Sequence, residues 1–278
     1  MDKPVGPTSH DVVARVRRAL GVRSVGHTGT LDPFASGLLA VLVGRATRLA
    51  RFVEAQPKTY LAVARLGWAT TTDDATGAPL EAAGPTGEPE IGEVERVLTT
   101  FLGPQTQRPP AFSAKHVDGE RSYRKARRGE LVELPEVQIL VHALELTGYC
   151  YPELHFRATV SAGTYVRALA RNLGERLGSR AHLTALRREA IGALRVERAI
   201  PLEAVQPGMA LLPAEEILGH LPRVVLEGPE RELVVHGRAV DRAEPVSGTV
   251  LLMHGDRLVG VAAAGGGRLR PTVVLEGA

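Results

Sequence analysis

The densest cluster of unusual residue types lies at residues 26–37, which read GHTGTLDPFASG. Glycines and an Asp-Pro dipeptide predict a tight loop here, because glycine adopts backbone conformations that other residues resist. Loops held by rigid elements often carry catalytic groups, and Asp32, the carboxylate of this segment, could act as a nucleophile or as a base. In an arbitrary protein, an aspartate before proline is more often only a turn residue. A phosphate-binding loop does not fit, because no Gly-Lys-Ser/Thr follows.

The segments around this loop have the periodicities of regular elements. Residues 8–21 read TSHDVVARVRRALG and predict a helix with a capping box at Thr8 and Asp11 and a stop at Gly21. The apolar run 37–44 predicts one short buried strand, residues 46–55 return to helical spacing, and residues 59–67 predict another strand. The loop therefore lies between a helix and a buried strand.

Further along the chain, helical and strand patterns alternate around loops. A polar loop is predicted over 70–89, a helix over 92–103 and strands over 137–146 and 153–160. The clearest helix is predicted over 164–178, because its apolar residues fall on one side, and it places Tyr165 and Arg167 in its first turn. Prolines and glycine at 201–213 indicate a boundary, and short strands are predicted after it.

Composition excludes several classes of protein. The 278 residues are 44% hydrophobic and 23% charged, which is ordinary for a globular chain. One cysteine, Cys150, allows neither an internal disulfide nor a structural zinc site based on thiolates. The first residues lack the apolar core of a secretory signal, and no segment approaches the roughly 18 apolar residues that span a bilayer. We therefore expect a cytoplasmic protein with no membrane role.

Basic residues are unevenly distributed along the chain. Residues 15–51 contain seven arginines and one acid, residues 164–188 contain six arginines and one acid, and residues 113–128 contain six bases and two acids. The last 60 residues contain seven bases and seven acids. Such clustering is typical of a polyanion-binding surface, since each phosphate contact releases counterions. Charge alone is equally compatible with a solvated arginine-rich surface.

Taken in chain order, these segments resemble the motifs of the TruB family of tRNA pseudouridine synthases. The loop GHTGTLDPFASG resembles the family's signature, and KPVGPTSHDVV at 3–13 resembles its opening motif. The remaining matches are KTY at 58–60, a T-x-T-x-D-x-x-G pattern at 70–77, QRPPAFSAKHVDGERSYRKARRGE at 107–130, SAGTYVRALARNLGERLG at 161–178 and AHLTALRR at 181–188. The tail GRLRPTVVL resembles, more weakly, the end of a PUA-like RNA-binding module.

The resemblance implies a fold and an activity. It implies an α+β catalytic domain with a mixed, largely antiparallel sheet over residues 1–210, an RNA-contacting insertion at about 105–135, and a small β-rich PUA-like module over 215–278. It also implies isomerisation of uridine 55 in the T loop of tRNA to pseudouridine, without cofactor or metal. The implied partner is the T arm of tRNA, with no obligatory protein partner.

The resemblance also implies roles for individual residues. Asp32 is the essential carboxylate, Arg167 is its cationic partner that keeps it ionised, and Tyr60 stacks on the target base. His27 fills the space left when the base is flipped out of the RNA loop. The other residues expected to bind substrate or RNA are Lys3, Lys58, Asp74, Tyr165, Leu186, Arg121 and Arg124.

Two positions depart from the family pattern, and three alternative functions remain open. His116 stands where the family usually has lysine, and Ala162 where it commonly has a larger or polar residue, which concerns RNA grip more than catalysis. A glycoside hydrolase would need a second carboxylate, for which Asp74 is available. A non-catalytic RNA-binding protein would need only the basic patches, and a guide-RNA-dependent relative would act on ribosomal RNA.

Overall fold

The computed structural model describes residues 1–80, 87–113, 116–117, 120–122, 128, 130, 134–242 and 246–276. The chain forms two compact units. Unit 1 comprises Met1–Thr8, Leu31–Leu38 and Ala55–Ala199, and unit 2 comprises Ser9–Thr30, Leu39–Glu54 and Ile200–Ala278. The chain therefore crosses between the units more than once, and the division into a catalytic domain and a C-terminal module remains a prediction.

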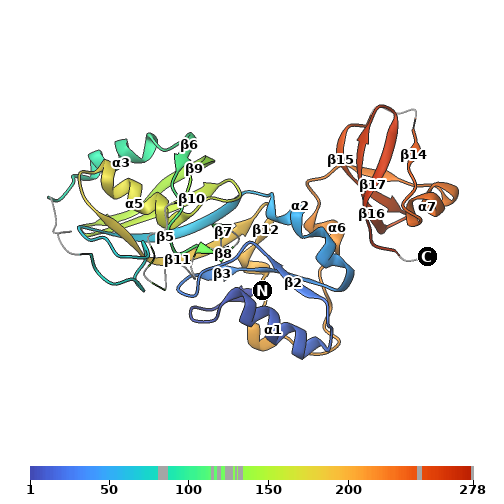
Figure 1. The fold of residues 1–278 in the computed structure, drawn as a ribbon, viewed down its shortest axis with the longest axis horizontal. Helices are drawn as coiled ribbons and strands as arrows, with labels where there is room; N and C mark the ends of the chain where they lie inside the picture. Colours follow the sequence, from blue (N-terminus) through green and yellow to red (C-terminus); the bar gives the residue numbers. More distant parts are fainter. Residues whose placement is uncertain are drawn as a thin grey trace. The chain divides into compact units, whose positions relative to one another are not determined.

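Unit 1 is built on an eight-stranded sheet (Figure 1). The strand order is β1 (Asp2–Lys3), β3 (Ser36–Leu38), β11 (Ala181–Ile191), β5 (Lys58–Leu66), β10 (Glu153–Val160), β9 (Val137–Cys150) and β6 (Gly103–Gln107), and β12 (Leu194–Arg195) pairs with β11. Only the β3–β11 pair among these described strands is parallel. The expected mixed, largely antiparallel sheet is confirmed.

Two helices cover the sheet of unit 1. The helix α5 (Val166–Arg176) contacts β11 and β5, and α3 (Ile91–Thr99) contacts β9. The two helices also contact each other, so they cover the same face. Strand β5 alternates buried and more accessible residues, as expected for a strand with one face on a core. The predicted helices and strands at 59–67, 92–103, 137–146, 153–160 and 164–178 are confirmed to within a few residues.

The apolar run 37–44 does not form one strand. It divides at Leu39 into β3 and β4 (Ala40–Val43), and β4 pairs with β2 (Val25–Thr28) in a separate two-stranded sheet of unit 2. An apolar run cannot reveal which sheet its residues join, because that depends on distant pairing partners. The predicted helix at 46–55 is also divided, into a 3₁₀ segment η1 (Gly44–Leu49) and α2 (Ala50–Glu54). The first helix, α1 (Ser9–Leu20), is confirmed.

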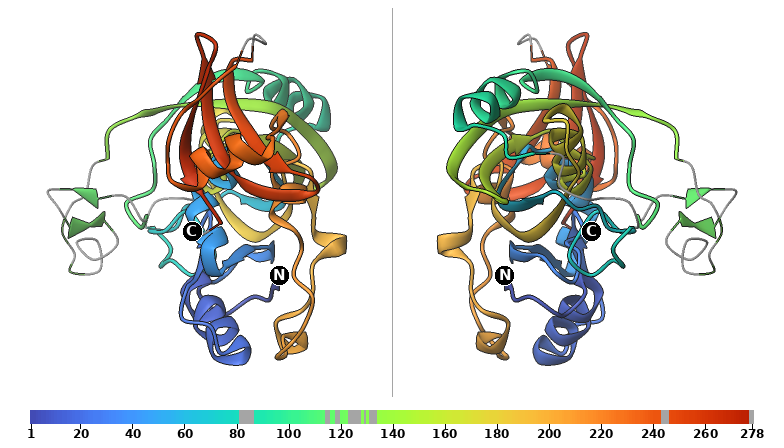
Figure 2. Two further views of the ribbon diagram at one scale, coloured as in Figure 1. Left: turned by 90° about the vertical axis from the view of Figure 1, so that its right-hand side faces the viewer. Right: turned by 90° about the vertical axis from the view of Figure 1, so that its left-hand side faces the viewer.

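The C-terminal part of unit 2 is a five-stranded sheet (Figure 2), which confirms the short strands predicted there. Its order is β13 (Arg223–Val225), β15 (Gly248–His254), β16 (Arg257–Gly265), β17 (Arg268–Val274) and β14 (Val240–Asp241), and α7 (Gly228–Val235) packs against it. Buried valines and leucines, including Val250, Leu252 and Val259, form its own core. The shorter described elements are β7 (His116–Val117), β8 (Glu120–Arg121), η2 (Val196–Arg198), η3 (Leu202–Ala204) and α6 (Ala214–Ile217). None of the helices in the described ranges has both the length and the hydropathy of a membrane crossing.

Strand β3 approaches β11 so closely that only glycine fits at position 37. Gly37 has φ 102°, and a Cβ added there would lie 2.3 Å from the carbonyl oxygen of Arg188. We expect Gly37→Ala to lower the free energy of unfolding by at least about 3 kcal/mol, through backbone strain and overpacking together. Gly163→Ala is the control, because Gly163 also has a positive φ, of 82°, but has open space around it. We expect this control substitution to lower the free energy of unfolding by about 1 kcal/mol. Urea unfolding of both variants measures the difference, and equal losses would contradict the close approach.

Candidate active site

Arg167 is the centre of a buried charged cluster in unit 1. Its side chain is only 4% exposed, and its Nε lies 2.9 Å from Oδ2 of Asp32. Its Nη1 lies 3.4 Å from Oδ2 of Asp74 and donates to the Thr72 carbonyl at 2.8 Å, and its Nη2 donates to the Phe112 carbonyl at 2.9 Å. A planar guanidinium offers donors in fixed directions, so four acceptors hold this side chain in one orientation. The Asp32–Arg167 pair expected from the sequence is present.

Asp74 is held by its own loop. Its Oδ1 accepts hydrogen bonds from Thr72 Oγ1 at 2.8 Å, from the Thr76 backbone at 2.9 Å and from Thr76 Oγ1 at 2.5 Å, which leaves Oδ2 for Arg167. Gly77 closes this loop, because a Cβ at that position would lie 2.5 Å from Thr72 Oγ1. The T-x-T-x-D-x-x-G pattern therefore forms a cage around one carboxylate, and that carboxylate orients Arg167.

Asp32 occupies a short turn immediately before β3. The Ala35 backbone donates to the Asp32 carbonyl at 3.1 Å, and the Gly6 backbone donates to the Pro33 carbonyl at 2.8 Å. Burial raises the pKa of Asp32 above its ordinary value, while the positive charges of Arg167 and Lys3 oppose this shift. Its side chain is still 36% exposed, so of the two carboxylates on Arg167 it is the one that a ligand can reach.

The start of α5 is fixed by a residue that the sequence did not single out. Gln107 is buried, its Oε1 accepts from the Tyr165 backbone at 2.8 Å, and its Nε2 donates to the Tyr165 carbonyl at 3.0 Å. This amide clamp places Tyr165 next to Arg167 at the N-terminal end of the helix. Burial also raises the pKa of the Tyr165 phenol. The sequence around Gln107 does not predict this contact, because its partner, Tyr165, is 58 residues away.

Four residues form one row across the sheet. Lys3 on β1 lies opposite Gly37 on β3, Gly37 lies beside Arg188 on β11, and Arg188 lies opposite Tyr60 on β5. At about 4.8 Å per strand, Lys3 and Tyr60 are therefore about 15 Å apart along the row. Arg188 is fully buried and donates from Nε to the Leu38 carbonyl at 2.7 Å. It was not expected as a site residue, although it ties β3, the strand that follows Asp32, to the centre of the sheet.

Lys3 is buried at one end of this row. Its Nζ donates to the carbonyls of Pro4 and Pro7, each at 2.9 Å. Burial, the largest cause, and the charge of Arg188 lower the pKa of Lys3 to about 8, while Asp32 raises it. Lys3 therefore contributes positive charge near Asp32 from inside the protein. Its role in RNA binding stays a prediction.

The other predicted site residues lie in unit 1, in unit 2 or outside the described residues. Leu186 is buried on β11 opposite Ala62 and shares the sheet face of Tyr60. Lys58 is buried on β5, and its Nζ donates to the Gln56 carbonyl at 2.7 Å. His27 lies on β2 in unit 2 opposite Val41. The side chain of Arg121 and the whole of Arg124 lie outside the described residues.

The cluster has the composition of a nucleophile or base site with one accessible carboxylate. Asp32 is accessible and paired with a rigid cation, whereas both oxygens of Asp74 are occupied and its side chain is only 5% exposed. A group bound beside Asp32 would therefore meet a carboxylate that is accessible and oriented by Arg167. In the described ranges, no three His, Cys, Asp or Glu side chains gather as metal ligands.

Comparison with known proteins gives one consistent family. A family model described as "TruB family pseudouridylate synthase (N terminal domain)" matches residues 17–166. A protein of Synechococcus sp. (strain WH7803) named "tRNA pseudouridine synthase B" is 42% identical over 290 residues, covering 99% of this chain and 96% of that protein. Proteins of the same name from Thermobifida fusca and Aquifex aeolicus are 42% and 38% identical, covering 100% and 99% of this chain and 97% and 98% of theirs.

Solved structures share the fold along almost the whole chain. A chain from the "Crystal Structure of a Cbf5-Nop10-Gar1 Complex" superimposes with a TM-score of 0.74 at 26% identity, covering 99% of this chain and 84% of that one. A chain from the "archaeal box H/ACA sRNP Nop10-Cbf5 complex" gives a TM-score of 0.72 at 24% identity and covers 99% and 85%. At that identity, the second likeness establishes the fold alone.

Proposed function

This chain belongs to the TruB family of pseudouridylate synthases, and on that premise we propose that it converts uridine 55 in the T loop of tRNA into pseudouridine. It is a pseudouridine synthase of the tRNA-modifying kind, as the names of relatives at about 40% identity over their full length indicate. The observation that carries the finer proposal is the Asp32–Arg167 pair, with its contact of 2.9 Å.

The reaction needs one well-placed carboxylate. The bond between C1′ and N1 of the uridine breaks, the uracil turns, and a new bond forms between C1′ and C5. C5 then loses its proton and N1 carries one, so that the product is an isomer and no oxidant or reductant is consumed. We assign to Asp32 the role of nucleophile or base in bond cleavage and to Arg167 the role of holding it. Tyr60, in the same row as Gly37, is assigned to the wall against which the base stacks.

The target base must leave its RNA loop before it can reach Asp32. Extruding a base costs a few kcal/mol, and a flat ring that fills the vacated position offsets part of this cost. We assign that role to His27, as the family resemblance implies. Arg121 and Arg124 are assigned to the phosphates of the T arm, which fix the register of the RNA rather than its sequence.

The glycoside hydrolase alternative is weakened by the state of Asp74. Hydrolysis of a glycosidic bond usually uses two carboxylates, one on each side of the bond. Here Asp74 shares the guanidinium of Arg167 with Asp32 and fills its other oxygen with threonine donors. It therefore supports the orientation of Arg167 rather than a second catalytic role. Free uracil among the products would restore the alternative.

We propose further that the protein acts as a stand-alone enzyme in the cytoplasm. In this proposal residues 1–210 form the catalytic domain and residues 215–278 form a PUA-like RNA-binding module. The solved relatives include protein–protein complexes, whereas the motif set of this chain resembles the tRNA enzyme that needs no protein partner.

The experiment that tests the proposed function uses pure protein and an unmodified tRNA transcript. We expect one equivalent of pseudouridine per tRNA, located at position 55, and none in a transcript that carries cytidine at that position. The transcript variant is the matched control, because it preserves the tRNA fold. Modification at another position, or a requirement for a guide RNA, would refute the assignment.

The pH dependence of the reaction follows from the burial of Asp32. We expect kcat/KM to fall as pH is lowered, with a midpoint above the ordinary aspartate pKa of about 3.9, because the carboxylate must be ionised and burial raises its pKa. Tritium release from tRNA labelled at uracil C5, measured from neutral pH down to the onset of unfolding, gives the profile. tRNA binding measured over the same range is the control, and a flat profile down to pH 4 would contradict the prediction.

A further inference from the structure

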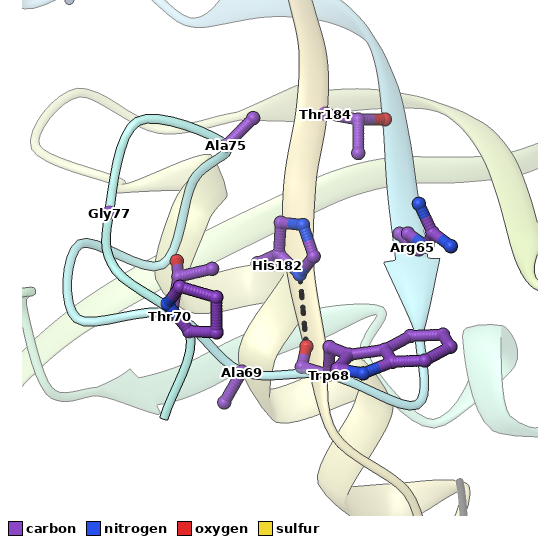
Figure 3. A pocket seen from close by; sticks show the side chains of 9 residues that line it. Arg65, Trp68, Ala69, Thr70, Ala75, Gly77, His182 and Thr184 are labelled. Atoms are coloured by element: carbon purple, nitrogen blue, oxygen red, sulfur yellow. Dashed lines mark hydrogen bonds between the residues drawn. The ribbon is translucent and has the colours of Figure 1, made fainter. Parts of the chain in front are cut away.

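A cavity lies in unit 1, on the opposite sheet face from Tyr60. Alternation along β5 places residues 60 and 65 on opposite faces, and Arg65 lies directly opposite His182 on β11. The cavity has a volume of about 370 Å³, which is within the range of ligand sites. Figure 3 shows its walls, which are formed by Arg65, Trp68, Ala69, Thr70, Ala75, Gly77, Pro79, His182 and Thr184.

The side chains of this pocket combine an aromatic surface with positive charge. Trp68, the single tryptophan of the chain, is 36% exposed, and the Arg65 guanidinium lies over its ring at 4.7 Å from the centroid. His182 Nδ1 lies 3.0 Å from the Trp68 carbonyl oxygen, which can only accept, so Nδ1 donates this hydrogen bond. None of the nine described wall residues is acidic. An exposed indole next to an exposed arginine fits a planar, hydrogen-bonding and anionic ligand.

We propose that this pocket binds one unpaired nucleotide of the tRNA substrate, outside the T loop. The base would pack against Trp68 and His182, and its phosphate would contact Arg65, the combination that single-stranded RNA sites use. The choice of ligand rests on the proposed function, because that function makes tRNA the molecule that this chain binds. We infer the position outside the T loop from the sheet, because Arg65 and His182 of the pocket and the row that contains Tyr60 lie on different faces.

The pocket is also connected to the catalytic cluster through one loop. Thr70, in the pocket wall, donates from Oγ1 to the Asp74 carbonyl at 2.7 Å, and the carboxylate of Asp74 holds Arg167. The same loop is pinned beside His182, since the Ala75 backbone donates to the Leu183 carbonyl at 2.8 Å. A nucleotide against Thr70 and Ala75 would therefore stabilise the loop that orients Arg167.

The single tryptophan makes the proposal directly measurable. We expect intact tRNA to quench the fluorescence of Trp68 saturably in the full chain, and a hairpin of the T arm alone to bind without changing it. Unchanged emission with intact tRNA, or equal quenching by the hairpin, would overturn the proposal. Quenching by AMP without quenching by tRNA would also overturn it, because the site would then take a free nucleotide rather than RNA. The measurement is made on Asp32→Asn, so it does not depend on turnover.

Substitutions separate stacking, charge and folding. We expect Trp68→Ala to raise the Kd for tRNA about 10-fold and Trp68→Phe to stay within about threefold, because phenylalanine keeps a stacking ring. We expect Arg65→Gln to weaken binding and to reduce the salt dependence by about one phosphate contact. Arg96→Gln, on the exposed side of α3, removes the same charge elsewhere on the protein. It should change neither the affinity for tRNA nor the salt dependence of binding. Wild-type affinity in a folded Trp68→Ala protein would sink the proposal, whereas absence of pseudouridine formation would refute only the proposed function.

Discussion

Asp32→Asn is expected to lower the rate of pseudouridine formation by at least about 10⁴-fold, the loss seen when a covalent catalyst loses its reacting group. Asparagine keeps the size of the side chain and its contact with Arg167, but it can neither attack carbon nor accept a proton. Asp74 cannot substitute for it, because both of its oxygens already serve the loop and Arg167. The whole loss should therefore appear in the chemical step.

The measurement is tritium release from tRNA labelled at uracil C5. Wild-type enzyme should release one equivalent and Asp32→Asn none above background, while tRNA binding by the variant stays within a few-fold of wild type. Glu189→Gln is the matched control, because it removes a carboxylate that is paired with Arg157 at 2.9 Å elsewhere in the sheet. Substantial release from Asp32→Asn would refute the role assigned to this carboxylate.

The same substitution should not weaken the fold. Because burial raises the pKa of Asp32 in the folded state, its ionised form is favoured more by the unfolded chain. Below the pKa that Asp32 has in the unfolded chain, its carboxyl is protonated in both states and does not affect the free energy of unfolding. As pH rises through its folded-state pKa, the carboxyl ionises and lowers the free energy of unfolding. At pH 7 we therefore expect the free energy of unfolding of Asp32→Asn to equal or exceed that of wild type, with the difference vanishing at acid pH. Thermal unfolding at the two pH values provides the comparison.

Arg167→Met is expected to have the second largest effect, and on both activity and stability. Removal of the guanidinium leaves Asp74 as a buried charge without its cation and leaves the Thr72 and Phe112 carbonyls without this donor. Breaking a buried ion pair on one side costs about 3–5 kcal/mol, and Asp32, the carboxylate proposed to react, also loses its anchor. We expect kcat to fall by about 10²- to 10⁴-fold, the size of a positioning and charge effect.

Two further variants test the physical reason. Arg167→Lys keeps the charge, but an ammonium cannot reproduce the fork that contacts Asp32 and two carbonyls, so we expect it to recover stability only in part. Combining Arg167→Met with Asp74→Asn removes the uncompensated buried charge, and the double variant should be more stable than the sum of the single effects predicts. Urea unfolding gives the coupling energy. Strict additivity would indicate that the Arg167–Asp74 contact of 3.4 Å contributes little.

Local structure could be predicted well where the pattern depends on near neighbours. The helix α5 and the strand β5 follow from helical spacing and from alternation, and both place their site residues, Arg167 and Tyr60, at the expected ends. The strand β11 was recognised only as a motif, although it carries Leu186 and Arg188. Its bulges interrupt the alternation that would have identified it.

The sequence by itself determined that a loop aspartate, Asp32, meets the arginine of the first turn of a helix, Arg167, whereas the cage around Asp74 and its contact with Arg167 came from the structure. Only the tertiary structure decided how they meet. Four acceptors hold Arg167 from distant segments, including Asp32 and Thr72, and the run 37–44 divides between two sheets. The row from Lys3 to Tyr60 and the pocket at Trp68 likewise depend on strand pairing. The physical reason is that helical spacing and alternation are properties of adjacent residues, whereas pairing and burial depend on the packing of the whole chain.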